Sequence, residues 1–217
     1  MRAVKSVSPR SCAKENRQLS KILHVSENRI PGWGAMFGLL FLIGYTAGIL
    51  ICREQAPAVG QALARYYMDK QNYLSLSAAF GRMYSGLFLQ AGIVLLCGLS
   101  AFGSILLMTF FAVRGAVLGI CAASVFLEFE ARGLVVYWLL SCFTNVAALI
   151  LLLYLAQSAA RMAQNSLYMI WNPTVLHGAL KDRFKALLIR FLLVLAIGAF
   201  CAVLGALSAR LFAGILL

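Results

Sequence analysis

The feature that most constrains this chain is the stretch of residues 31–52, which contains no Asp, Glu, Lys, Arg or His. About 20 apolar residues of α-helix cross a hydrocarbon core about 30 Å thick, and a helix in a water-soluble core has no reason to stay uncharged over that length. Pro31 suits the first turn of such a helix, because its missing N–H would have no partner there. The stretch therefore predicts a retained transmembrane helix.

Three further charge-poor stretches follow it in the 217-residue chain. Over the whole sequence 62% of residues are hydrophobic and only 12% are charged, about half the charged fraction of a typical soluble domain. The apolar stretches fill more than half the chain and leave little room for a separate soluble domain. We therefore expect an all-α, polytopic transmembrane bundle at 31–217, preceded by a basic segment at 1–30.

The net charge of +12 lies largely beside these stretches. Lys and Arg next to a span mark its cytoplasmic side, and they attract anionic lipid. A nucleic-acid-binding arm would usually be attached to a folded binding module, and none is visible here. We therefore expect a cytoplasmic N-terminus that contacts the lipid bilayer and no nucleic acid. Seven basic residues precede the first span, against Glu15 and Glu27: Arg2, Lys5, Arg10, Lys14, Arg17, Lys21 and Arg29.

The long uncharged run at 83–113 is interrupted by Arg114 and then continues to Leu127. If one helix ended at Arg114, the next apolar run would be about 20 Å long, too short for the hydrocarbon core. If instead the chain turns at 98–103, the spans become 82–97 and 104–127. Arg114 then lies near mid-membrane, at a cost of about 2.5–3.5 kcal/mol. In the first partition, the mismatch between the short second helix and the hydrocarbon core has a similar cost, and only two residues are left for the turn between the helices. We therefore favour the turn at 98–103.

The rest of the chain predicts two more spans. Glu128 and Arg132, four residues apart, suit a helical ion pair in a short external link, and Gly133 breaks this link before a span at 134–156. The basic segment 157–185 belongs inside by the positive-inside rule, and the last span covers 186–207. This yields five spans, with the N-terminus inside, the C-terminus outside, an external loop at 53–81 and a cytoplasmic loop at 157–185.

The external loop contains apolar and aromatic residues among polar ones. This pattern predicts a short interfacial helix with tyrosines at headgroup depth. The alternative is a docking surface for a partner outside the membrane. The residues concerned are Leu63, Tyr66, Tyr67 and Tyr73.

No pattern typical of a catalytic or metal site is found. The six cysteines are scattered and the two histidines, His24 and His177, are far apart, so we expect no metal, no cofactor and no enzyme activity. The candidate intramembrane residues are Arg114 with Gly115 and Gly119, and Asn145. An ionisable residue inside a span suggests a function by default, whereas Asn145 suits a hydrogen bond between helices.

Two small-xxx-small patterns lie in the first span. Gly34 with Gly38, and Gly44 with Gly48, are each four residues apart. Such pairs let the backbone of a neighbouring helix approach closely. They predict that another helix packs on this face of the first span, but they do not identify that helix.

The run Gly98-Leu-Ser-Ala-Phe-Gly103, followed by Phe111-Ala-Val-Arg114-Gly115-Ala-Val-Leu-Gly119, resembles the central signature of the stage II sporulation protein M family. Asn145 would match an asparagine of that family's fourth helix. Prolines common in the family after the turn and beside this asparagine are missing here, as is an acidic residue near Ser208.

This resemblance implies a multi-pass scaffold in the cytoplasmic membrane of endospore-forming bacteria. Such a scaffold holds extracytoplasmic peptidoglycan-degrading partners, the cell-wall hydrolases, at the septal or engulfing membrane and hydrolyses nothing itself. The competing hypothesis is a small permease or channel subunit in which Arg114 and Asn145 line a path for an anionic or polar solute.

Overall fold

The computed structural model describes residues 32–54, 58–68, 75–171 and 177–216, all of which are helical apart from the cap and turn residues beside α5. Five segments of these helices are long and apolar enough to cross a membrane. The predicted all-α, multi-pass membrane protein is thereby confirmed. The elements are α2 (Gly32–Glu54), α3 (Ala58–Met68), α5 (Leu76–Leu99), α6 (Gly103–Trp171) and α7 (His177–Leu216).

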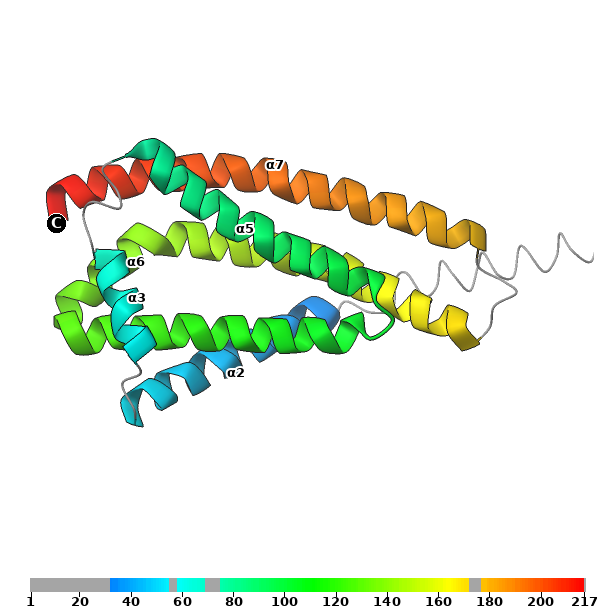
Figure 1. Cartoon of the computed structure of the whole chain (residues 1–217), viewed down its shortest axis with the longest axis horizontal. Coiled ribbons are helices and arrows are strands. Elements are labelled where there is room, and N and C mark those ends of the chain that lie inside the picture. Colours follow the sequence, from blue (N-terminus) through cyan, green and yellow to red (C-terminus); the bar gives the residue numbers. More distant parts are fainter. Residues whose placement is uncertain (1–31, 55–57, 69–74, 172–176, 217) are drawn as a thin grey trace, which may run out of the picture.

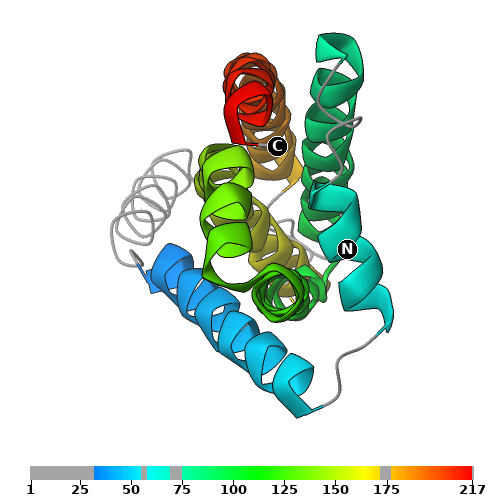
Figure 2. The same cartoon turned by 90° about the vertical axis from the view of Figure 1, so that its left-hand side faces the viewer.

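Helix α6 is folded into two arms and forms the centre of the bundle (Figures 1 and 2). The bend lies at Glu130, whose backbone has φ 57° and ψ −157°. Helix α2 lies obliquely against the first arm (Figure 2), whereas α5 and α7 pack on the second arm. Gly98 of α5 lies beside Ala159, and Gly198 of α7 lies beside Leu151.

The turn between α5 and α6 lies at Ser100–Phe102, inside the stretch where the sequence favoured it. The Ser100 N–H donates to the Cys97 carbonyl (3.1 Å), and the Gly103 N–H donates to the Ser100 carbonyl (3.0 Å). A side chain at position 103 would collide with the Cys97 carbonyl oxygen, so only glycine allows a turn this tight. The other partition, with one helix reaching Arg114, is therefore wrong.

Three predicted element boundaries are also wrong, because hydropathy marks where a helix meets lipid rather than where the helix ends. Helix α5 begins at Leu76 rather than near residue 82, so its span is 24 residues long and is no longer short. Helix α6 continues through residues 157–171, and α7 begins at His177. Much of the expected loop at 157–185 is therefore helix. Once a helix has begun, each further residue adds a hydrogen bond without a new nucleation cost.

The break in the link between the third and fourth spans lies at Glu130 rather than at the predicted Gly133, which is helical. This break also separates Glu128 from Arg132, so the two residues no longer share one helical face. Glu128 instead forms an ion pair with Arg65 of α3, with 2.8 Å between Oε1 and Nε. The predicted Glu128–Arg132 pair is therefore replaced by a contact between helices.

Candidate functional site

Glycines make the contact between α2 and the first arm of α6 a close backbone approach. A side chain at Gly44 or Gly48 would collide with the carbonyl oxygen of Ala112 or Ala116. On the other side of the contact, Gly115 faces the Phe41 carbonyl and Gly119 faces the Tyr45 carbonyl in the same way. Two glycine pairs, each four residues apart, therefore interlock.

This interlocking explains what Gly115 and Gly119 do: they let α2 approach the α6 backbone. Backbone contacts of this kind bring Cα–H groups against carbonyl oxygens and maximise van der Waals contact where lipid supplies no hydrophobic drive. The other predicted pair is different. Gly34 meets only the end of the Gln157 side chain, and Gly38 has nothing within 4 Å.

Arg114 lies on the face of α6 that points into the bundle. The residues at helical spacing from it on this face include Leu107, Phe111, Cys121 and Val125, all buried. Its Nη1 atom is buried, and it has no hydrogen-bond partner among the described residues. The acidic residues of the five spanning segments are Glu128 and Glu130, both at the bend of α6. Glu128, the nearer of the two along the chain, lies fourteen residues beyond Arg114, about 21 Å of helix. The positive charge of Arg114 therefore has no countercharge close to it on its own helix.

Arg114 is also far from both ends of its arm. It is eleven residues from Gly103 and sixteen from Glu130, which at 1.5 Å per residue is about 16 Å and about 24 Å. These distances place its Cα in the central part of the first arm of α6, away from both of its ends.

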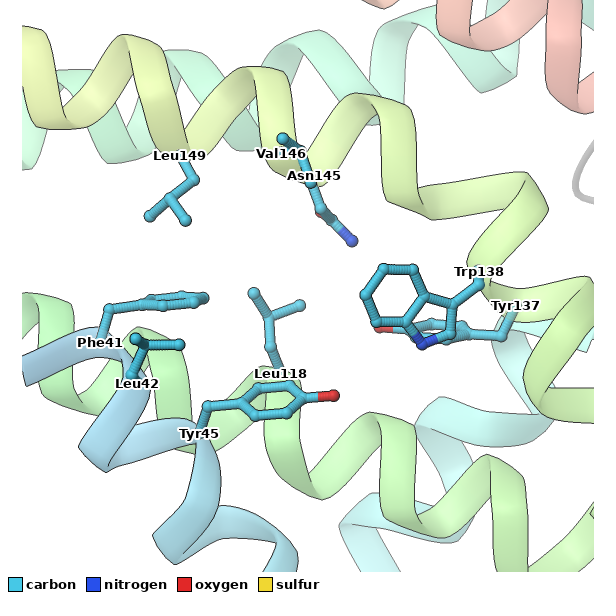
Figure 3. Close-up of a pocket in the computed structure, with 9 residues that line it drawn as sticks. All are labelled: Phe41, Leu42, Tyr45, Leu118, Tyr137, Trp138, Asn145, Val146 and Leu149. Carbon is cyan, nitrogen blue, oxygen red and sulfur yellow. The ribbon is translucent and has the colours of Figure 1, made fainter. Parts of the chain in front are cut away.

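A pocket of about 200 Å³ opens between α2 and the two arms of α6 (Figure 3). Its volume is somewhat above that of an engineered protein cavity of about 150 Å³ that holds benzene. Most of its lining is apolar or aromatic. The Asn145 amide and the Tyr45 hydroxyl extend from opposite walls toward the end where Trp138 lies. The lining residues are Phe41, Leu42, Tyr45, Leu118, Tyr137, Trp138, Asn145, Val146 and Leu149.

Asn145 and Arg114 do not form one cluster. Asn145 lines the pocket, and within the described part of the chain it makes no hydrogen bond between helices of the kind expected of it. Arg114 is not among the lining residues, but it lies one helical turn before Leu118, which is. Arg114 and Asn145 therefore do not share this pocket.

The predicted docking residues are only partly described. The side chains of Leu63 and Tyr67, and the whole of Tyr73, lie outside the described residues. Tyr66 is 46% exposed on α3. Its hydroxyl accepts a hydrogen bond of 2.8 Å from Nη1 of Arg82, whose guanidinium also lies over the Tyr66 ring. Together with the Arg65–Glu128 ion pair, this contact ties α3 to both α5 and α6.

Sequence reasoning missed a second basic residue inside a span, Arg190 of α7. Its Nη1 donates to the Ser158 hydroxyl of α6, and its guanidinium lies 5.6 Å from the centre of the Tyr154 ring. The signal was present, because Arg190 is the one charged residue between positions 186 and 207. Unlike Arg114, it has partners across a helix interface.

No protein-family model matches this sequence, and neither a curated protein nor a solved structure is significantly similar to it. Within the described ranges, no three His, Cys, Asp or Glu side chains come together in a way that could hold a metal ion. The candidate site is therefore defined by the glycine contact, the buried Arg114, the pocket and the anchored helix α3.

Proposed function

We propose that this protein is a membrane scaffold that holds extracytoplasmic partners on the surface of α3. Cell-wall hydrolases of an endospore-forming bacterium are the partners that the resemblance to the stage II sporulation protein M family implies. In this proposal the N-terminus is cytoplasmic and α3 lies outside the cytoplasmic membrane.

The observation that carries the proposal is the anchoring of α3. An isolated helix of eleven residues is marginal in water, yet α3 is tied to α6 by the Arg65–Glu128 ion pair and to α5 by Arg82. Gly60 adds a close contact with Ser124. A helix held in one orientation at the ends of the spans can present the same residues to a partner without a further ordering cost.

Affinity capture from detergent-solubilised membranes tests this proposal. Ala62 and Tyr66 lie four residues apart on the exposed side of α3, so Ala62→Arg should abolish capture of the hydrolase partner. Ala78→Arg, at an exposed position in the first part of α5, is a matched control and should leave capture unchanged. If the intact protein captures no extracytoplasmic protein, or if both variants capture it equally, the scaffold proposal is wrong.

A second candidate function, transport of an anionic or polar solute, is favoured by Arg114. A buried guanidinium in the central part of a spanning helix, without a countercharge close to it on that helix, suits a path that an anion occupies for part of the time. In vesicles, Arg114→Leu should then abolish solute flux while insertion and assembly persist. A scaffold would lose nothing on this substitution but would be sensitive to Ala62→Arg.

A further inference from the structure

Basic and amide side chains gather where the second arm of α6 runs beside the beginning of α7. The contact of Arg190 with Ser158 sets the register of these two antiparallel helices. Arg183 is seven residues before Arg190, and Asn165 is seven residues after Ser158. Seven residues are close to two helical turns, so Arg183 lies on the same face of α7 as Arg190, and Asn165 lies on the same face of α6 as Ser158. Because the two helices are antiparallel, Arg183 and Asn165 lie at the same height along the interface.

Arg161 lies on the same part of the interface, between Ser158 and Asn165. Helical spacing of three and four residues places all three on one side of α6. Arg161, Arg183 and Arg190 are each half-buried. The Nδ2 atom of Asn165 is buried, and it has no hydrogen-bond partner within the described residues. The interface thus carries three guanidinium groups and an amide donor for which the described residues supply no acceptor.

The local charge is strongly positive. Residues 157–190 contain five basic side chains and one acidic side chain, Asp182. Guanidinium and amide N–H groups only donate, so the missing component is a negatively charged group with several acceptor oxygens. A phosphate fits this requirement, because guanidinium groups bind its oxygens in pairs.

The depth of the cluster indicates where the phosphate comes from. A Cβ at Gly103 would lie 3.1 Å from the Ala163 Cβ, so the turn that ends α5 is nearly level with Asn165. The end of α6 and the beginning of α7 extend together past this turn (Figure 1). The cluster therefore lies at the edge of the spans, where lipid headgroups are found and where clustered Lys and Arg attract anionic lipid.

We propose that Arg161, Asn165, Arg183 and Arg190 bind the phosphate of an anionic membrane lipid between α6 and α7. Arg190 holds the two helices in register through Ser158, and Arg161 and Arg183 bind the phosphate oxygens. The Asn165 amide supplies a further donor. The site is independent of the scaffold proposal, because it lies at the opposite end of the spans from α3.

Native mass spectrometry of the full chain in detergent tests this site, with phosphatidylglycerol and phosphatidylcholine offered together. Wild-type protein should retain phosphatidylglycerol preferentially. Removing a basic group near a membrane surface weakens anionic lipid binding about fivefold, so Arg161→Gln with Arg183→Gln should weaken it about thirtyfold. Lys185→Gln is the matched control, since Lys185 is exposed on the other side of α7 from Arg183. It should change the affinity less than twofold.

Asn165→Asp gives a second measurement in case the double variant does not fold. It keeps the side-chain shape and should abolish phosphatidylglycerol retention, because its carboxylate repels the phosphate. The proposal is overturned if Asn165→Asp retains the lipid, or if Lys185→Gln loses as much lipid as the double variant. Inorganic phosphate in excess should not displace the lipid, and displacement would show a free phosphate to be the ligand instead.

Discussion

Gly44 of α2 lies against the backbone of Ala112 in α6 so closely that a methyl group at Gly44 would overlap the Ala112 carbonyl oxygen. Gly44→Ala should therefore push the helices apart and lower the free energy of unfolding by about 1–3 kcal/mol, the usual cost of overpacking. Gly38→Ala is the matched control, because Gly38 has nothing within 4 Å and alanine favours a helix. Thermal unfolding in detergent measures both, and equal midpoints for the two variants would contradict this packing.

Glu130 has a backbone conformation that residues other than glycine rarely adopt. Such a conformation costs about 1–3 kcal/mol, so Glu130→Gly should raise the midpoint of thermal unfolding. Glu128→Gly is the comparison, because it removes the ion pair with Arg65 and puts glycine in a regular helix. It should lower the midpoint. A fall for both variants would show that Glu130 is not strained.

The ion pair between Arg65 and Glu128 should contribute little to stability. Its side chains are 72% and 25% exposed, and exposed pairs are worth about 0.2–1 kcal/mol. A double-mutant cycle with Arg65→Gln and Glu128→Gln should give a coupling energy in this range that falls as salt is added. A large coupling that salt does not change would mean that the pair is shielded from water.

Replacing Arg114 should stabilise the purified protein. Its guanidinium has a buried Nη1 without a partner among the described residues, and arginine at the centre of a span costs about 2.5–3.5 kcal/mol. Arg114→Leu should therefore raise the free energy of unfolding by up to about that amount. Arg190→Leu should lower it, because Arg190 bonds to Ser158 and lies over Tyr154. Destabilisation by Arg114→Leu would reveal a bound partner at this residue.

The direction of the spans predicts which positions a membrane-impermeant thiol reagent reaches. In a variant without native cysteines, Ser100→Cys should react from the cytoplasmic side and Glu130→Cys from the outside. The reason is that the first arm of α6 separates the two positions and basic residues lie at the Ser100 end. Labelling of both positions from the same side would contradict the five-span arrangement.

Lipid-facing hydropathy is a property of a continuous stretch of residues, so the sequence alone determined that the chain is helical, that it is built into a membrane and that five segments can span it. The sequence also predicted the turn at 98–103, because a helix that ended at Arg114 would leave the following span too short for the hydrocarbon core. The spacing of Gly44 and Gly48 indicated a packing face in the same way.

Only the tertiary structure decided which helices meet. The partners of Gly44 and Gly48 are backbone carbonyls about seventy residues away, and Glu128 pairs with Arg65 rather than with Arg132 four residues on. The bend at Glu130 and the pocket at Asn145 likewise depend on how the two arms of α6 diverge. Packing in lipid is driven by shape and by a few polar contacts, and both arise between residues that are distant in the sequence.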